Sequence, residues 1–232
     1  MNLALLQRLN EARAAKRATC LVRFLATEEQ ALIVDGVVAA GITPGADVLD
    51  AVAEALRRDR SGMAETSHGR AFLQVFNPPL RLAIVGAVHI AQALAPMAAL
   101  AGYAVTVIDP RRAFASEARF PGVEIVCEWP DEALQALQPD RRTAIVTLTH
   151  DPKIDDPALD AALRGDAFYV AALGSRRTHA ARLGRLRELG HDETALARIH
   201  GPAGIDIGAV SPAEIAISVM AQMTKVLRQG SA

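Results

Sequence analysis

The chain has 232 residues, of which 51% are hydrophobic and only 4% aromatic, and its formal net charge is −1. This near-neutral balance excludes a general electrostatic attraction to nucleic acid, and two cysteines are too few for a disulfide framework. No apolar run is long enough to span a bilayer and no signal-peptide pattern is visible, so we expect a cytoplasmic protein without a membrane partner.

The first 79 residues predict a small α+β domain. Apolar periodicity indicates, in chain order, a helix, two strands, a helix and a strand, over residues 1–17, 19–25, 31–34, 46–58 and 70–76. The polar stretch 59–69 is expected to be a loop. Asn77-Pro78-Pro79 breaks the last strand, and we place a domain boundary there, with domains at 1–79 and 80–232.

After this boundary the pattern alternates between strands and helices. Strands are expected over 81–85, 104–109, 123–127, 143–148 and 169–173, and helices over 89–100, 130–137, 157–163, 178–189 and 212–228. Such alternation is typical of an α/β fold with a parallel sheet covered by helices on both faces. Right-handed crossovers favour the strand order 3-2-1-4-5, so the sequence predicts a Rossmann-like domain.

The turn after the first of these strands carries a damaged dinucleotide-binding pattern. The pattern G-x-G-x-x-G/A reads here as Gly86-Ala87-Val88-His89-Ile90-Ala91. Val88 stands where the second glycine would let a pyrophosphate approach the backbone. The sequence therefore predicts the Rossmann frame but disfavours the ordinary binding of NAD(P).

Polar residues follow four of the five predicted strands, at the edge where parallel α/β sheets bind their ligands. Because the carboxyl ends of parallel strands share one edge, we expect these residues to line a cleft. The candidate ligand-binding residues are Gly86, His89, Asp109, Arg111, His150, Asp151, Gly174, Ser175 and Arg176.

Several candidates also have a purely structural interpretation. Asp109 suits a ribose-binding acid or the start of an Asp-Pro turn, and His89 suits a neutral donor to a ligand or an ordinary first residue of a helix. His150 and Asp151 suit acid–base or metal chemistry, or a loop in which Asp151 caps a turn. No zinc-type spacing accompanies them, so the sequence leaves the presence of a metal open.

The best anion-binding pattern is the run that begins at Gly174. A glycine, the hydroxyl of Ser175 and exposed N–H groups at a helix start favour a phosphate, and Arg176 and Arg177 add positive charge. Further arginines make the following helix basic. The alternative is that a hydroxyl caps the helix while the arginines form a solvated face.

Together these motifs resemble the XdhC/CoxI family, the xanthine dehydrogenase accessory proteins. The matching segments, within about residues 82–223, are Gly86–Ala91, Val107–Arg111, Phe114, Arg119–Pro121, Leu148–Asp151, Leu173–Arg177, Gly204–Ala209 and Pro212–Ala216. Two departures matter. Family members usually have a glycine where this chain has Val88, and many carry a Gly-Gly-Cys motif that residues 1–79 lack, so a cysteine-based role is not transferred.

The resemblance implies a non-catalytic chaperone with a Rossmann-like C-terminal domain. Such proteins bind the molybdenum cofactor (molybdopterin), protect it while its terminal sulfur is installed, and pass it to an apo molybdenum hydroxylase of the xanthine dehydrogenase type. It also implies a homodimer, with a cysteine desulfurase as the sulfur donor. The cofactor's phosphate would need an anion cradle such as Gly174–Arg177, and its pterin would need partners such as Asp109, His150 or Asp206. The alternative is an NAD(P)-dependent oxidoreductase that uses the same cleft.

Overall fold

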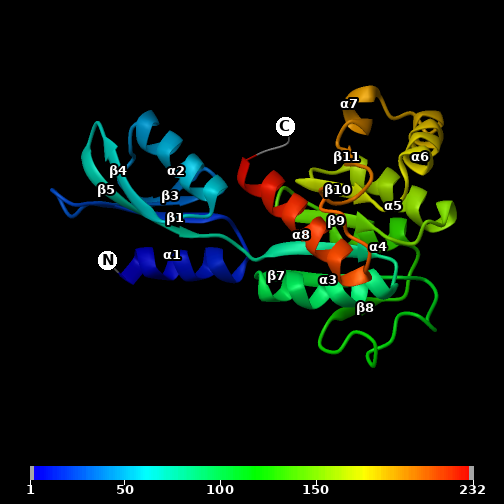
Figure 1. The fold of residues 1–232 in the computed structure, drawn as a ribbon. Helices are drawn as coiled ribbons and strands as arrows, with labels where there is room; N and C mark the ends of the chain where they lie inside the picture. The colour runs from blue at the N-terminus through cyan, green and yellow to red at the C-terminus, as the bar shows by residue number, and fades with distance from the viewer. Residues whose placement is uncertain (1–2, 230–232) are drawn as a thin grey trace. The chain divides into compact units, whose positions relative to one another are not determined.

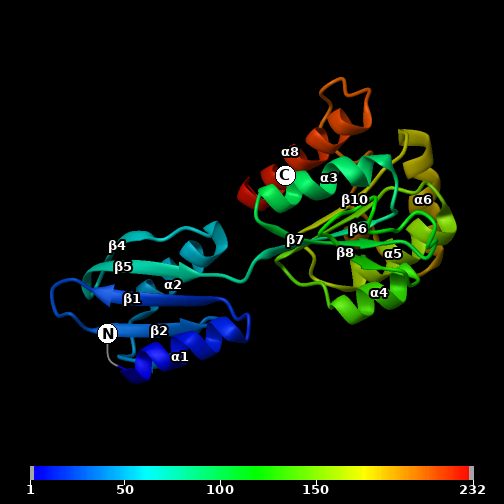
Figure 2. The ribbon, with the colours of Figure 1, turned by 90° about the horizontal axis from the view of Figure 1, so that it is seen from below.

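A computed structural model describes residues 3–229 of the chain. The chain divides after Pro78 into two compact units, each with its own sheet and its own hydrophobic core (Figures 1 and 2). Within the described residues, no helix combines the length and the apolar composition needed to cross a bilayer.

The N-terminal unit is a five-stranded antiparallel sheet, in the order β3-β2-β1-β5-β4, with one helix on each face. Successive side chains of a strand point to opposite faces, so Val22 and Phe24 pack with α2 while Leu21 packs with α1. The elements are α1 (Leu3–Ala14), β1 (Thr19–Phe24), β2 (Gln30–Val34), β3 (Val37–Gly41), α2 (Ala46–Arg58), β4 (Gly62–Thr66) and β5 (Gly69–Phe76).

The two edge strands of this sheet, β3 and β4, depart from the sequence prediction. β4 lies within 59–69, and the prediction of a loop there is wrong. Neither strand contains a fully buried residue, because each has a neighbour on one side only. The buried apolar pattern on which a strand prediction depends is therefore absent from both.

The C-terminal unit is an all-parallel six-stranded sheet in the order β11-β10-β9-β6-β7-β8. Helices α3 and α8 pack on one face, where Leu94, Val219 and Met223 are buried, and α4, α5 and α6 cover the other face (Figure 2). The elements are β6 (Leu80–Val85), α3 (His89–Leu100), β7 (Tyr103–Ile108), β8 (Glu124–Val126), α4 (Pro130–Leu137), β9 (Thr143–Thr147), α5 (Pro152–Arg164), β10 (Tyr169–Ala172), α6 (Arg176–Glu188), α7 (Glu193–Leu196), β11 (Ile199–His200) and α8 (Pro212–Gln229).

This unit confirms the predicted α/β, Rossmann-like class and differs from the prediction in details. The five predicted strands occupy the order β8-β7-β6-β9-β10, and a sixth strand, β11, extends the β10 edge. β11 has two residues, too few to leave a periodic pattern in the sequence. Helix α5 begins at Pro152 rather than at residue 157, because Asp151 caps it and proline is compatible with a first helical position.

The turn between β6 and α3 depends on Gly86. Its φ is +109°, a conformation that side chains with a Cβ rarely adopt, and its amide donates to the carbonyl of Ile108 at 2.8 Å. A Cβ at this position would lie 2.5 Å from Cγ2 of Thr149 and 3.3 Å from its amide nitrogen. Glycine is therefore needed both for the turn and for its close approach to the loop after β9.

We expect Gly86→Ala to lower the free energy of unfolding by about 2–5 kcal/mol, since backbone strain and overpacking both contribute. The matched control is Gly102→Ala, because Gly102 also has a positive φ (+89°) but a Cβ there would meet no atom within 4 Å. The control should lose only the conformational part, about 1–2 kcal/mol. Urea denaturation measures both values, and equal losses would contradict the steric role of Thr149.

Candidate functional site

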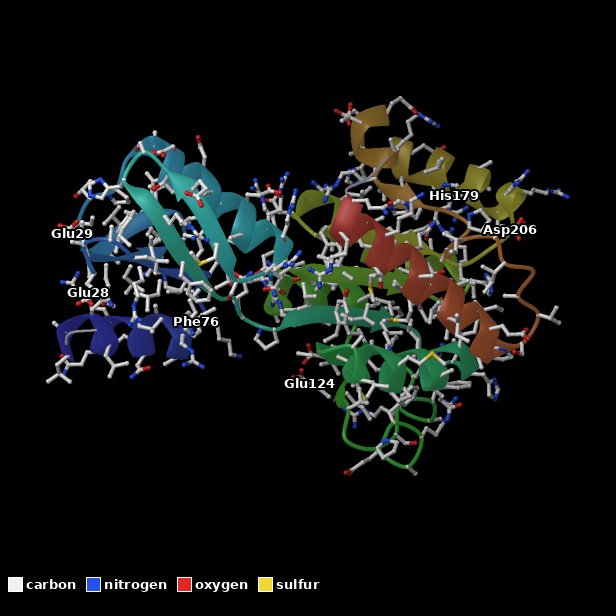
Figure 3. The ribbon with its side chains drawn as sticks, turned by 60° about the vertical axis from the view of Figure 1, so that its left-hand side comes forward. Glu28, Glu29, Phe76, Glu124, His179 and Asp206 are labelled. Atoms are coloured by element: carbon white, nitrogen blue, oxygen red, sulfur yellow. The ribbon has the colours of Figure 1, made fainter. Side chains whose placement is uncertain are left out.

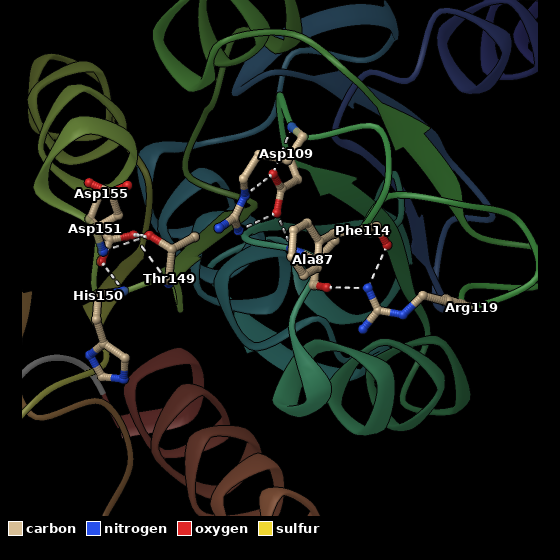
Figure 4. A network of polar contacts seen from close by, with 9 residues as sticks. Ala87, Asp109, Phe114, Arg119, Thr149, His150, Asp151 and Asp155 are labelled. Atoms are coloured by element: carbon tan, nitrogen blue, oxygen red, sulfur yellow. Dashed lines mark hydrogen bonds and ion pairs between the residues drawn. The ribbon is translucent and has the colours of Figure 1, made fainter.

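The carboxyl ends of β6, β7, β9 and β10 lie at one edge of the parallel sheet, and the loops after them carry most of the predicted site residues. Figure 4 shows residues of the loops after β6, β7 and β9. Three of these loops lead directly into helices α3, α5 and α6, whose N-termini face the same edge. The fourth runs from Asp109 to β8 and has no regular structure. Helix N-termini and open loops at this edge are the usual setting for a ligand site in such folds.

Asp109 lies directly after β7, is fully buried, and has both carboxylate oxygens occupied (Figure 4). Oδ2 accepts hydrogen bonds from the amide of Ala87 and from Nη2 of Arg111, both at 2.8 Å. Oδ1 accepts from the amide and from Nε of Arg111, both at 2.9 Å. Burial acts to raise the pKa of Asp109, but the hydrogen bonds and charge of its partners outweigh burial and lower that pKa. Asp109 is thus a constant anion that orients Arg111.

The loop after β7 presents an arginine and an aromatic ring at the site edge. The side chain of Arg111 is 37% exposed, and its Cζ lies 4.6 Å from the ring centroid of Phe114, which is itself 45% exposed. This distance is typical of a cation–π contact. Together the two side chains form a partly exposed cation–π pair in the loop after β7.

Arg119 fastens this loop to the turn after β6, and sequence reasoning missed its role. Nη1 donates to the carbonyl of Ala87 at 2.8 Å and to the carbonyl of Phe114 at 2.7 Å (Figure 4). Nη2 donates to Oε1 of Gln92 at 3.1 Å. The sequence marks Arg119 only as part of a family segment, because its hydrogen-bond acceptors are distant in the chain.

The loop after β9 is organised by a second buried carboxylate, Asp155, in the first turn of α5 (Figure 4). Its Oδ1 accepts from Oγ1 of Thr149 at 2.6 Å and from the Thr149 amide at 3.3 Å, and its Oδ2 accepts from the His150 amide at 3.0 Å. Burial raises the pKa of Asp155, and the hydrogen bonds of Thr149 and the charge of Arg182 oppose this only in part. Sequence reasoning missed Asp155 because it predicted a later start of the helix.

His150 and Asp151 lie in the same loop but have different roles. His150 has a left-handed backbone (φ +62°) and an exposed side chain at the site edge. The Oδ1 atom of Asp151 accepts from the amide of Lys153 at 2.9 Å, which confirms the capping interpretation of Asp151. The side chain of His150 is therefore available to a ligand, whereas Oδ1 of Asp151 is committed to the helix cap.

The loop after β10 combines a glycine of positive φ with a capped helix. Gly174 has a φ of +143°, and Oγ of Ser175 accepts from the amide of Thr178 at 3.1 Å, so Ser175 is the N-cap of α6. The side chains of Arg176 and Arg177 are exposed at the start of this helix. Their charges add to the positive end of the helix dipole, which favours an anion.

Two predicted residues lie outside these hydrogen-bonded clusters. His89 is the exposed first residue of α3. The N-cap residue of that helix is Val88, whose side chain makes no capping hydrogen bond. Asp206 is exposed on the loop before α8 (Figure 3), where its Oδ1 accepts from the amide of Gly208 at 3.3 Å. Over residues 3–229, no group of three or more His, Cys, Asp or Glu side chains is placed to hold a metal ion.

The C-terminal unit matches a known protein family. The family model described as the XdhC Rossmann domain matches residues 82–223. The chain is 36% identical over 151 residues to the molybdenum cofactor insertion chaperone PaoD of Escherichia coli, covering 65% of this chain and 41% of PaoD. It is 30% identical over 159 residues to a probable xanthine dehydrogenase subunit of Bacillus subtilis, covering 68% of this chain and 46% of that protein.

A solved structure extends the similarity to almost the whole chain. A crystal structure described as a xanthine dehydrogenase from Bacillus halodurans aligns with a TM-score of 0.75 and 25% identity, covering 98% of this chain and 68% of that one. In both curated relatives, the aligned part is less than half of the relative's length.

We expect Asp109→Asn to lower the free energy of unfolding at neutral pH by about 2 kcal/mol, because it removes the charge from a buried carboxylate that holds Arg111. Since the native pKa of Asp109 is lowered, its stabilising effect is present above the unfolded pKa of about 3.9 and is lost as pH falls through the native pKa. The variant should therefore lose less stability than the wild type on acidification below about pH 4.

Urea denaturation between neutral pH and pH 3 measures this difference. The control is Glu193→Gln, which breaks the exposed ion pair with Arg187 and should cost at most about 0.5 kcal/mol. An Asp109 variant that behaves like this control would contradict the structural role of the buried carboxylate.

We expect Arg119→Lys to loosen the loop after β7, because an ammonium group cannot reproduce three hydrogen bonds made from two guanidinium nitrogens. Chymotrypsin should cleave faster after the half-exposed Phe114, with a loss of about 1–2 kcal/mol in the free energy of unfolding. Arg112→Lys, an exposed change in the same loop, is the control. Equal cleavage rates in both variants would show that Arg119 is not the fastening residue.

Proposed function

Since the chain belongs to the XdhC family through its Rossmann domain, we propose that it is an accessory protein that binds the molybdenum cofactor and inserts it into a molybdenum hydroxylase of the xanthine dehydrogenase type. The names of two relatives support the proposal, one a molybdenum cofactor insertion chaperone and the other a probable xanthine dehydrogenase subunit. In this proposal the cofactor is cargo, protected while its terminal sulfur is installed.

The state of Asp109 is the observation that favours a carrier over an NAD(P)-dependent oxidoreductase. In dinucleotide-binding folds an acid near this position accepts hydrogen bonds from the ribose hydroxyls. Here the carboxylate is fully buried, and Ala87 and Arg111 already occupy both of its oxygens. Val88 adds a side chain where a pyrophosphate would approach the backbone. Both features oppose the usual dinucleotide pose.

The same edge has groups suited to a phosphorylated heterocycle. We assign the phosphate to the turn of Gly174, Ser175 and Arg176, where positive charge and a helix N-terminus coincide. We assign the planar pterin to the surface formed by Arg111 and Phe114, because aromatic rings stack on guanidinium and phenyl faces.

The remaining site residues have supporting roles in the proposal. His89, His150 and Asp206 are exposed and offer hydrogen bonds to the polar edge of the pterin. Asp109 contributes through Arg111, which it orients. Gly86 and Asp151 shape the backbone of their loops.

The finer parts of the proposal concern partners and setting. We propose that a cysteine desulfurase provides the terminal sulfur, that the chain works as a homodimer, and that it acts in the cytoplasm. Half-exposed Ile217 on α8 provides apolar surface that a second copy of the chain would cover.

The direct test is to purify the full chain from a host that makes the cofactor and to measure the fluorescent oxidised pterin per chain. We expect bound pterin, and calorimetry with NAD and NADP should give no saturable heat at micromolar concentrations. Tight binding of NAD or NADP, together with its substrate-dependent reduction, would contradict the carrier function and support the oxidoreductase. If the chain forms a complex with the hydroxylase but carries no bound pterin, its role is that of a scaffold and not of a cofactor carrier.

We expect Arg176→Ala to weaken cofactor binding about tenfold or more, the usual effect of losing a hydrogen bond to a charged group, with little change in stability because the side chain is exposed. The control is Arg187→Ala, an exposed arginine in the last turn of the same helix. Pterin retention during gel filtration measures the effect, and equal retention in both variants would remove Arg176 from the site.

A further inference from the structure

Two ion pairs join helices α5 and α6, and they use consecutive carboxylates of α5. In the outer pair, Nη2 of Arg185 donates to Oδ1 of Asp156 at 3.1 Å, and the arginine side chain is 39% exposed. In the inner pair, Nη2 of Arg182 lies 3.5 Å from Oδ2 of Asp155, and the two side chains are only 2% and 1% exposed. Both pairs tether the same two helices, so any difference in their roles comes from what else each pair contacts.

The carboxylate of the inner pair holds the loop that presents His150 (Figure 4). Asp155 accepts from the hydroxyl of Thr149 at 2.6 Å and from the amide of His150 at 3.0 Å. The backbone of His150 is left-handed (φ +62°), a conformation that residues with a Cβ adopt rarely, so a partner elsewhere in the fold must maintain it. The direction in which the His150 side chain leaves the backbone therefore depends on Asp155.

The guanidinium of the inner pair holds the loop after β10. Nη2 of Arg182 donates to the carbonyl of Leu173 at 2.9 Å, and this carbonyl belongs to the peptide that precedes Gly174. A Cβ on Gly174 would lie 3.8 Å from the same Nη2, so the guanidinium lies against the turn that leads to Ser175 and Arg176. Nε and Nη1 are buried and have no hydrogen-bond partner within residues 3–229. The polar contacts of Arg182 thus lead to both site loops, to one directly and to the other through the carboxylate of the inner pair.

The outer pair differs from the inner pair in this respect. Both carboxylate oxygens of Asp156 accept from Arg185, and in the described part of the chain neither residue forms a hydrogen bond to the side chains or backbone of the two site loops. Arg185 follows Arg182 by three positions, so the two arginines are neighbours on one face of α6. The outer pair is therefore a matched reference, because it joins the same helices without reaching the site.

We propose that Arg182 is a positioning residue that couples the loop after β9 to the loop after β10. Together with Asp155 it sets the spacing between His150 on the first loop and Arg176 on the second, although Arg182 itself is too buried to contact a ligand. A ligand that bridges the two loops then binds groups whose spacing is already fixed, which lowers the entropic cost of binding. Because such coupling is reciprocal, a change in either loop affects the other. The inference rests on the proposed function only for the identity of the ligand.

The first test is backbone NMR of the cofactor-free full chain. Arg182→Met removes the guanidinium but keeps much of the side-chain volume, and it leaves Asp155 without its counter-charge. We expect the amide resonances of Thr149 and His150 to shift, and their hydrogen exchange to become about tenfold faster, the effect of weakening one hydrogen bond to a charged group. Arg185→Met, which breaks the outer pair, should leave both amides as in the wild type. Equal changes in the two variants, or unchanged amides in Arg182→Met, would overturn the proposal.

A second variant tests the coupling from the other side and applies even if Arg182→Met fails to fold. Asp155→Asn keeps the shape of the side chain but removes its charge. It should shift the amide resonances of Gly174 and Ser175 in the loop after β10, although Asp155 forms its hydrogen bonds in the loop after β9. Asp156→Asn, at the neighbouring carboxylate, is the control. Resonances of Gly174 and Ser175 that stay in place in Asp155→Asn, or that move equally in Asp156→Asn, would refute the coupling.

The consequence for the site is measured as the pterin retained per chain after purification from a cofactor-producing host. We expect Arg182→Met to retain about tenfold less than the wild type, and Arg185→Met to retain as much as the wild type. Equal retention in the wild type and Arg182→Met would show that the coupling does not position the site. The NMR measurements involve no cofactor. If no protein retains pterin, the proposed function fails while the coupling of the loops stands or falls on the amide resonances alone.

Discussion

The carboxylate of Asp109 joins the loops that follow two neighbouring parallel strands, β6 and β7. It accepts from the amide of Ala87 after β6 and from Arg111 after β7, and Arg119 closes the same connection from the other end of the loop. The half-exposed pair of Arg111 and Phe114 depends on this arrangement, because Asp109 orients the guanidinium and Arg119 holds the backbone carbonyl of Phe114. The arrangement of this edge therefore depends on a charged side chain, that of Asp109, which is not exposed to solvent.

Two buried carboxylates stabilise this edge, and their pKa values are shifted in opposite directions. Asp109 is held as an anion because the hydrogen bonds and charge of Arg111 and the Ala87 amide outweigh its burial, so its pKa is lowered. Asp155 has more desolvation than its partners compensate, so its pKa is raised. The loop after β7 is thus fixed by a paired anion, whereas the loop after β9 is fixed by a carboxyl group with a weaker preference for its charged form.

The sequence predicted the parts of this molecule that depend on local pattern. Buried runs with an apolar centre, such as Thr143–Thr147, identified the central parallel strands, and strand ends located Asp109, His150 and Gly174. The edge strands β3, β4 and β11 were not predicted because they are short or half-exposed. Arg119, Asp155 and Arg182 were missed for other reasons. Arg119 bonds the carbonyl of Ala87, which only the fold brings near, and Asp155 was missed because the helix was predicted to start after it. An arginine in a basic helix, such as Arg182, gives no sign of being buried.

The contact between Gly86 and Thr149 has a consequence for the history of the family. The space that a Cβ at position 86 would need is filled by the methyl group of residue 149, so the two positions cannot vary independently. A lineage could not acquire a side chain in the turn after β6 by losing the Thr149 methyl group alone, because the positive φ of Gly86 and the amide nitrogen of residue 149 would still exclude it. A side chain in this turn would therefore require the backbones of both loops to change together.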